Sequence, residues 1–333
     1  MSQSQGVDDN VIPLPGSTPA ATTSGSLRAP LYVAWQLTNE CNLACLHCIE
    51  ESGPGKAFPD ELDEEQVFAV LNQILDEDVP YLSFSGGEPM THPRFFDLVE
   101  LACASGAQLK IETNGHYLTP EASARLKELG VKAVQVSLDG TTRESFGRMR
   151  LRGDFDRTIE GLRNLGRAGV PIEINFSPTS FNAHEIERAV DLAYELGAHS
   201  FYTGRTMYTG NAVKTWPKIN PTEEQYAALF ATLRDKTEHY RGRMRVHFHE
   251  MGLLEELRYR LHNPAALLIL LPNGLVKLIN ALPFVCGDLR RQSLSEVWAN
   301  FQRAWQNPQV ARFVEELAVN PEATARLHQW IRV

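Results

Sequence analysis

The sequence has 333 residues, of which 43% are hydrophobic and 22% are charged. This composition supports one large folded domain, or a large domain with a small one, and it excludes a chain that is disordered throughout. The 41 acidic residues outnumber the 32 basic ones, and the net charge of -9 argues against a broad surface for nucleic acid or anionic membrane. No apolar run is long enough to span a membrane, and the N-terminus lacks the basic start and apolar core of a secretory signal. We therefore expect a cytoplasmic protein.

The organisation of the chain changes along its length. Residues 1–30 are rich in Ser, Thr, Gly, Pro and Ala without an apolar period, which predicts a flexible tail. Residues 31–220 then alternate short apolar runs with amphipathic segments of helical period. The expected strands cover 31–36, 81–84, 108–112, 133–137, 171–176 and 200–203. The expected helices cover 63–75, 93–104, 120–129, 155–168 and 184–196.

This alternation predicts an α/β fold with a parallel sheet and helices on its outside. Either a partial (β/α)6 TIM-like barrel or an open doubly wound sheet fits the spacing. In both, chemistry belongs at the C-terminal edge of the strands. Residues 221–333 are expected to form a small α+β accessory region, with strand-like runs at 267–271 and 275–279.

Three of the five cysteines, Cys41, Cys45 and Cys48, follow the first expected strand with the spacing C-x3-C-x2-C. Three thiolates in one loop leave one iron of a 4Fe-4S cluster open to an external ligand, whereas structural zinc takes four protein ligands. His47 is a fourth candidate ligand for zinc, but it is adjacent to Cys48 in the chain. A zinc site and a purely structural role for the three cysteines stay as the weaker alternatives.

Glycine-containing polar motifs follow the next three expected strands. They are Ser85-Gly86-Gly87-Glu88-Pro89, Glu112-Thr113-Asn114-Gly115 and Ser137-Leu138-Asp139-Gly140. Each alone is an ordinary turn or helix cap. Because they follow successive parallel strands, they are expected at the same sheet edge as the cysteines.

Taken together, the cysteine spacing and the ordered motifs resemble the radical S-adenosylmethionine (SAM) superfamily over about residues 31–212. The resemblance implies one 4Fe-4S cluster on Cys41, Cys45 and Cys48, and a flavodoxin- or ferredoxin-type reductant as partner. It also implies reductive cleavage of SAM to a 5′-deoxyadenosyl radical, which abstracts hydrogen from a substrate.

The same resemblance implies which residues contact SAM. The Gly-Gly-Glu motif is the segment that holds the amino group of SAM in this family. Arg148 and Arg152 flank the arginine expected at the SAM carboxylate, so the register of that contact stays open. The implied SAM contacts are Gly86, Gly87, Glu88, Thr113, Asn114, Ser137, Asp139, Arg150 and, near the adenine, His47.

The C-terminal region resembles SPASM or twitch domains in Pro272-Asn273-Gly274, Cys286-Gly287-Asp288-Leu289 and the segment at 293–298. Those domains carry auxiliary iron-sulfur clusters on several cysteines. Here Cys286 alone remains, which predicts a cluster-free region. Cys286 is either a buried small side chain or a thiol that returns a hydrogen atom to a substrate radical.

Substrate contacts are expected from Tyr202, Arg205 and Tyr208, which follow the sixth expected strand. The leading hypothesis is a SPASM-like radical SAM enzyme of a biosynthetic pathway, acting on a ribosomal peptide or on a precursor of a cofactor or natural product. An alternative is a small-molecule epimerase, dehydrogenase or decarboxylase acting on a sugar or tetrapyrrole. An alternative of another class is a non-catalytic iron-sulfur or zinc scaffold, against which the intact Gly-Gly-Glu motif argues.

Overall fold

One mixed sheet organises the protein, seen in a computed structural model that describes residues 27–326 and 328–333. The predicted tail falls outside the described residues, apart from its last four. In the described part, eleven strands pair in the order β13-β12-β11-β10-β1-β3-β4-β5-β7-β8-β9. These strands are β1 (Tyr32–Gln36), β3 (Tyr81–Ser85), β4 (Gln108–Thr113), β5 (Ala133–Ser137), β7 (Ile172–Phe176), β8 (Ser200–Gly204), β9 (Arg245–His249), β10 (Leu267–Leu270), β11 (Leu275–Lys277), β12 (Phe284–Asp288) and β13 (Ile331–Arg332). A separate pair joins β2 (Ala44–Cys45) to β6 (Arg150–Leu151).

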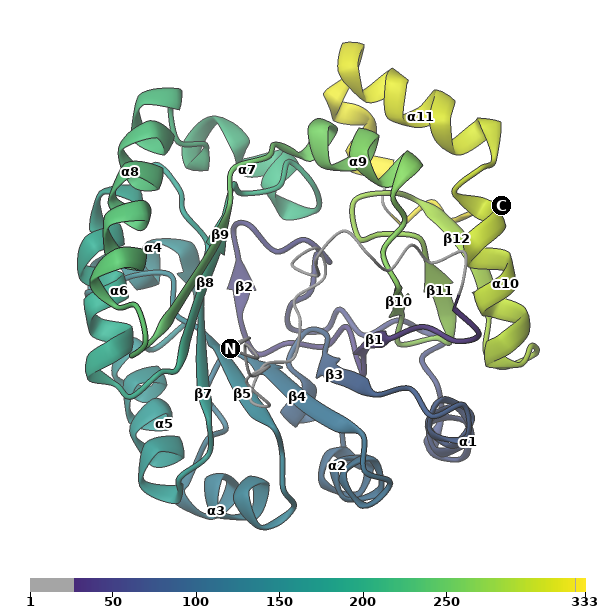
Figure 1. The fold of residues 1–333 in the computed structure, drawn as a ribbon, viewed down its shortest axis with the longest axis horizontal. Coiled ribbons are helices and arrows are strands. Elements are labelled where there is room, and N and C mark those ends of the chain that lie inside the picture. Colours follow the sequence, from purple (N-terminus) through teal and green to yellow (C-terminus); the bar gives the residue numbers. More distant parts are fainter. Residues whose placement is uncertain (1–26, 327) are drawn as a thin grey trace, which may run out of the picture.

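Neighbouring strands from β10 to β9 run parallel, and β10, β11 and β12 pair antiparallel. The sheet is strongly curved, and helices cover its outer side (Figure 1). This arrangement confirms the predicted α/β fold and favours the partial barrel over the flat, doubly wound sheet. The carboxyl ends of the parallel strands therefore meet at one rim.

The helices follow the strands much as the sequence predicts. They are α1 (Glu64–Asp76), α2 (Phe95–Ala104), α3 (Pro120–Glu128), α4 (Arg143–Met149), α5 (Phe155–Ala168), α6 (Ile186–Glu195), α7 (Asn211–Ile219), α8 (Glu223–His239), α9 (Leu253–His262), α10 (Leu294–Ala304) and α11 (Pro308–Val319), with 3-10 turns at η2 (Pro89–Thr91), η3 (Ala183–Glu185) and η4 (Pro321–Arg326). Among the described residues, no helix is both long and apolar enough to cross a membrane.

Local sequence sets the helix ends. Helix α5 begins after Asp154, whose side chain accepts a hydrogen bond from the Arg157 N–H, and it ends at Gly169 in the left-handed conformation (φ 70°). Helix α1 begins with a reciprocal capping box between Asp63 and Gln66. The boundaries predicted for α5 are confirmed to the residue because both of its ends carry such signals.

The parallel strands have an apolar outer face, and several of them carry polar side chains on the inner face. In β4, Leu109 and Ile111 are buried in the apolar core, while Lys110 and Glu112, on the opposite face, form ion pairs with carboxylate and ammonium groups inside the barrel. The inner face of the sheet thus includes charged groups, unlike its outer face.

The C-terminal strands continue the same sheet. Strand β10 pairs with β1, and β9 closes the opposite end by pairing with β8. The Trp298 indole N–H of α10 donates to the carbonyl of Leu27 at 2.9 Å, which ties the C-terminal region to the start of the described chain. The boundary predicted near residue 220 stays a prediction, because strands from beyond it complete both sides of the sheet.

Candidate active site at the carboxyl rim

The three clustered cysteines lie in the loop after β1. Cys45 is in β2, directly opposite Arg150 of β6, and the Cys48 N–H donates to the Cys45 carbonyl at 3.3 Å. Two side chains reach the sulfur atoms: Asn114 Nδ2 lies 3.9 Å from Cys41 Sγ, and Arg150 Nη1 lies 3.7 Å from Cys45 Sγ. The loop thus brings its thiols to the rim, where side chains from β4 and β6 meet them.

The chemistry of these thiols suits a metal cluster. Burial raises the pKa of Cys41 to about 11 and that of Cys45 to about 12, and burial also raises the pKa of Cys48. The charge of Cys48 further raises the pKa of Cys41, and the charges of Cys48 and Cys41 further raise the pKa of Cys45. Within residues 27–326 and 328–333, no three His, Cys, Asp or Glu side chains are arranged around a position that could hold a metal ion.

The Gly-Gly-Glu loop after β3 packs directly on the segment that leads into the cysteines. The Gly87 N–H donates to the Thr38 carbonyl at 2.7 Å, and the Glu88 N–H donates to the Glu40 carbonyl at 2.9 Å. A β-carbon at Gly87 would overlap the Glu40 carbonyl, and one at Gly86 (φ 136°) would overlap the Thr38 carbonyl. Glycine is required here because two backbones lie side by side.

Glu88 is fully buried at the rim, with its carboxylate held from three sides. Its Oε1 accepts from the Thr113 hydroxyl at 2.8 Å and from the Met90 N–H at 3.2 Å, and its Oε2 accepts from the Asn114 N–H at 2.8 Å. Burial raises the pKa of Glu88 to about 7, and the hydrogen bonds from Asn114 and Thr113 limit that rise. A carboxylate in this state gains strongly from a cationic partner such as an amine.

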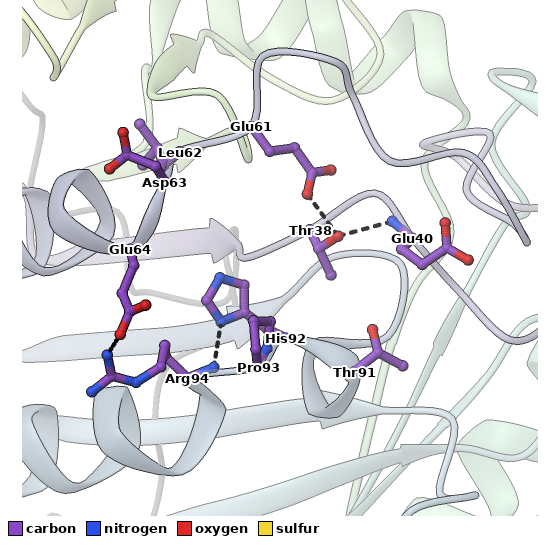
Figure 2. Close-up of a pocket in the computed structure, with 10 residues that line it drawn as sticks. All are labelled: Thr38, Glu40, Glu61, Leu62, Asp63, Glu64, Thr91, His92, Pro93 and Arg94. Carbon is purple, nitrogen blue, oxygen red and sulfur yellow. Dashed lines mark hydrogen bonds and ion pairs between the residues drawn. The ribbon is translucent and has the colours of Figure 1, made fainter.

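A pocket of about 390 Å³ lies beside the segment that carries Thr38 and Glu40, and the side chains that line it fix this segment (Figure 2). Its Glu61 accepts from the Thr38 hydroxyl at 2.9 Å and from the Asn39 N–H at 2.7 Å, and Thr38 Oγ1 in turn accepts from the Glu40 N–H at 3.0 Å. These bonds fix the segment on which Gly86 and Gly87 rest.

Asp139, which follows β5, binds several charged and polar groups on the opposite side of the rim. Its Oδ2 lies 2.7 Å from Arg150 Nη2 and 3.0 Å from His47 Nε2, and its Oδ1 accepts from the Ser177 N–H at 2.7 Å. Burial alone would raise the pKa of Asp139, but Arg150 and His47 bring it down to about 2. Asp139 therefore stays ionised and positions Arg150 and His47.

The three arginines of this segment lie in different surroundings. Arg150 is buried beside Cys45, whereas Arg148 lies over the Phe181 ring at 4.3 Å and Arg152 is exposed with a φ of 67°. Ser137 ends β5 half-buried, in register with Asn175 of β7. The implied SAM contacts therefore lie along one rim, although their contact with SAM stays a prediction.

One rim residue was missed from the sequence. His116 Nδ1 lies 3.2 Å from Asn42 Nδ2, and its Nε2 accepts from the Asp154 N–H at 3.1 Å. Asn114 Nδ2 also donates to Asn42 Oδ1 at 2.8 Å. This network orients the side chain nearest to Cys41. The only signal was the position of His116 just after the Thr-Asn-Gly motif.

A cavity of about 540 Å³ extends from this rim down the open side of the barrel. Near the rim it is lined by Gln36, Ser85 and Glu112. Its opposite wall comes from β9 and α9, and its far end is apolar. The lining there includes Leu267, Ile269, Leu278, Ile279, Phe301 and Trp305. Because Ser85 directly precedes the Gly-Gly-Glu motif, the cavity adjoins the predicted SAM site.

The predicted substrate residues have different positions. Arg205 lines the cavity, but both of its terminal nitrogens are bonded to Glu223 at 2.8 Å. Tyr202 stacks on His247 with ring centroids 4.7 Å apart, below the cavity surface. Tyr208 packs on Trp216, away from the cavity lining.

Cys286 lies in the apolar core of the C-terminal strands, where its thiol donates to the Val276 carbonyl at 3.5 Å. It is not part of the cavity lining. The structure thus places Cys286 with the small buried side chains, and it does not bring the thiol to the cavity where a hydrogen donor would act.

A buried charged cluster inside the barrel was also missed from the sequence. Lys110 Nζ lies 3.4 Å from Glu112 Oε1 and 3.6 Å from Glu173 Oε2, and the Tyr202 hydroxyl lies 3.3 Å from Glu173 Oε1. Charged residues at alternate positions of an expected strand were the available signal. Of this cluster, Glu112 lines the cavity.

Comparison with known proteins agrees with this geometry. Residues 35–193 match the sequence model of the radical SAM superfamily. Mycofactocin maturase MftC of Mycobacterium tuberculosis (strain ATCC 25618 / H37Rv) is 36% identical over 213 residues, which cover 64% of this chain and 54% of that protein. The chain thus spans about half the length of these maturases. AdoMet-dependent heme synthase of Methanosarcina barkeri (strain Fusaro / DSM 804) is 28% identical over 293 residues, covering 82% of this chain and 83% of that protein.

Two solved structures share the fold. Streptococcus suis SuiB bound to S-adenosylmethionine superposes with a TM-score of 0.67 at 16% identity, covering 83% of this chain and 67% of that chain. The native anSMEcpe structure with bound AdoMet gives a TM-score of 0.65 at 18% identity, covering 83% of this chain and 82% of that chain. These similarities confirm the TIM-like architecture predicted from the sequence.

Proposed function

The chain carries a radical SAM domain at residues 35–193, and on that premise we propose that it abstracts hydrogen from a biosynthetic substrate with one 4Fe-4S cluster and SAM as cofactors. The observation that carries the proposal is the arrangement of side chains at the rim. Three thiols lie in one loop, and the first of them, Cys41, interacts electrostatically with the buried carboxylate of Glu88, whose surroundings favour binding a cation. When bound, the cluster and SAM supply the 5′-deoxyadenosyl radical.

Different side chains of the rim hold the cluster and SAM in this proposal. Cys41, Cys45 and Cys48 are the cluster ligands in this proposal. Glu88 accepts the amino group of SAM, since its carboxylate is already desolvated and oriented by Thr113 and Asn114. On the opposite side, Arg150 and His47 are held by Asp139, and they bind the carboxylate and orient the adenine of SAM respectively.

The substrate in this proposal is a peptide or a precursor of a cofactor, bound in the cavity beside the rim. The relatives support both classes, because one is a mycofactocin maturase and another is a heme synthase. A peptide is the leading candidate. A tetrapyrrole is the second one, supported by the heme synthase match, which spans most of both chains.

Electron supply and location complete the proposal. A flavodoxin- or ferredoxin-type reductant delivers the electron. The described cysteines are all unpaired thiols, which suits the reducing cytoplasm that we propose as the site of action.

Anaerobic reconstitution with iron and sulfide, followed by dithionite and SAM, tests the function. We expect iron content for one 4Fe-4S cluster and formation of 5′-deoxyadenosine. Cys41→Ala, Cys45→Ala and Cys48→Ala should each lose both. Cys103→Ala is the matched control, because this half-buried cysteine lies on α2 and should keep both. A bound cluster without 5′-deoxyadenosine would instead support the non-catalytic scaffold.

A further inference from the structure

We propose that the substrate is a peptide that binds in extended form as an additional strand on the free edge of β9. The inference deepens the proposed function and rests on it for the chemistry, while the binding itself can be measured without turnover. It begins with the position of β9, which is the last strand of the sheet and pairs on one side with β8. Terminal strands keep a row of unpaired main-chain groups.

The register shows which groups those are. The Arg245 N–H donates to the His199 carbonyl at 2.9 Å, while Arg245 pairs with Ser200. In a parallel ladder, alternate residues turn both main-chain groups to the same neighbour. Residues 245, 247 and 249 therefore bond to β8, and the N–H and carbonyl groups of Val246 and Phe248 point away from it. The described residues provide no other main-chain partner for these two positions.

The free edge faces the cavity. Val246 and Phe248 both line it, although their side chains are turned to the core, where Phe248 stacks on Phe230 with centroids 6.0 Å apart. What they present to the cavity is consequently their main chain. Consecutive residues 246–249 form one continuous wall. This wall is the template that strand addition requires.

The direction of β9 also suits the chemistry. Because β9 is parallel to the strands of the core, its carboxyl end points to the rim that holds Glu88 and the cysteines. The cavity beside it reaches Ser85 and Glu112 at that rim. A peptide that follows β9 thus has one end close to the predicted radical and the rest on the apolar wall of β10.

The charges of the cavity favour a peptide over a tetrapyrrole. Its two arginines are already paired, Arg205 with Glu223 at 2.8 Å and Arg260 with Glu256 at 2.7 Å. Glu112 shares Lys110 with Glu173, so two carboxylates surround one ammonium group. The several carboxylates of a tetrapyrrole would have to break such pairs, whereas a peptide backbone carries no net charge.

The decisive variant is Val246→Pro, because proline removes one of the two N–H groups, those of residues 246 and 248, that point to the cavity, and it leaves the ladder with β8 intact. The matched control is Val246→Ala, which keeps that N–H while trimming the side chain. Random dodecapeptides displayed in a library are selected on the full-length, cluster-loaded chain with SAM present. The affinities of the enriched peptides are then measured on all three proteins.

We expect enriched peptides to bind about tenfold more weakly to Val246→Pro than to Val246→Ala, the usual effect of losing one buried hydrogen bond with its partner left unpaired. The same peptides are also N-methylated at alternate positions, in two complementary sets, and their binding to the wild-type chain is measured. This second test does not depend on whether a variant folds. One alternate set should abolish binding, and the other set should leave it nearly unchanged.

Equal binding to the two variants, equal effects of the two N-methylated sets, or no enriched peptide would overturn the proposal. So would coproporphyrin III if it displaced the peptides and bound Val246→Pro as well as wild type. Failure of the radical chemistry is a separate outcome, because it appears as absent 5′-deoxyadenosine while peptide binding persists.

Discussion

A single carboxylate, Asp139, organises one side of the rim. It is buried, and it faces both Arg150 at 2.7 Å and His47 at 3.0 Å. Two cationic or hydrogen-bonding groups from different loops thus depend on one acidic side chain. Removing its charge leaves the Arg150 guanidinium buried without a counter-ion.

Asp139→Asn should therefore lower the free energy of unfolding by about 3 kcal/mol, as expected when one partner of a buried ion pair is lost. Urea denaturation at pH 7 measures this. Asp156→Asn is the control, because Asp156 forms an exposed pair with Arg143 and should change stability by less than about 1 kcal/mol. Similar losses in the two variants would show that Asp139 does not hold Arg150.

The low pKa of Asp139 also predicts how stability depends on pH. In the folded protein this pKa is about 2, against an ordinary value of 3.8, so the ionised form favours the folded state. The contribution is complete above the ordinary pKa and is lost as the pH falls through about 2. The stability difference between wild type and Asp139→Asn should be constant from about pH 8 to 5 and shrink between about pH 4 and 2. A constant difference across that lower range would contradict the assignment.

Glu88 should make SAM binding depend on pH, because its pKa is raised, whereas that of Asp139 is lowered. Burial raises its pKa to about 7, so the carboxylate is mostly protonated at pH 6 and mostly ionised at pH 8. The affinity of the cluster-loaded chain for SAM should rise roughly tenfold over that interval, in proportion to the ionised fraction. Equilibrium dialysis of SAM at pH 6, 7 and 8 measures it. The Glu88→Gln variant should bind SAM weakly, with an affinity that does not change between pH 6 and 8. If its affinity rose with pH as that of the wild type does, Glu88 would not be a SAM contact.

At the residue scale, the order of motifs along the chain identified most of the rim. Cys41, Glu88 and Asp139 follow the first, second and fourth expected strands, and parallel strands bring their carboxyl ends together. The direct contact of His47 with Asp139 could not be predicted, because it depends on how the cysteine loop folds back. His116 was missed for the same reason, since a lone histidine after a turn has no distinguishing spacing.

At the scale of elements, the loop between β3 and η2 depends on close backbone approach. Gly87→Ala should destabilise the protein by about 2 kcal/mol or more, because its β-carbon overlaps the Glu40 carbonyl and that backbone cannot move without breaking the Glu88 N–H bond. SAM binding should fall with it. Thermal and urea unfolding measure the change.

Gly147→Ala provides the comparison within a helix. Gly147 lies in α4, and an added β-carbon there has no atom within 4 Å. The alanine should be neutral or stabilise the helix by up to about 1 kcal/mol. If both glycine variants proved neutral, the close packing of the two loops would not be needed for the site.

Element boundaries were predictable where capping and periodicity agreed. Helix α5 and strand β5 have the limits that the sequence predicts, while α7 was not expected. Its segment contains Pro217 and begins at Gly210 without a side-chain cap, so it lacks the usual signals of a helix. The position of strand β9 at the end of the sheet is a property of long-range pairing that local sequence does not encode.

At the scale of the whole molecule, the C-terminal region is joined to the core through main-chain pairing. Strand β10 pairs with β1 along four residues, and the Leu62 N–H donates to the Pro272 carbonyl at 2.8 Å. Gln73 of α1 donates to the Leu289 carbonyl at 3.1 Å. The accessory region predicted at 221–333 thus contributes strands to the central sheet.

Residues 221–333 should consequently unfold together with the barrel. Native-state hydrogen exchange on the chain without cofactors measures this, since the amides of Leu268 and Leu270 in β10 should exchange with the same free energy as those of Val33 and Trp35 in β1. A shared sheet requires it, because β10 cannot leave without exposing the edge of β1. Val319, at the exposed end of α11, is the internal control and should exchange faster. Exchange of β10 at a distinctly lower free energy than β1 would show instead that the C-terminal region opens as a unit of its own, and that the far wall of the cavity is a movable part of the site.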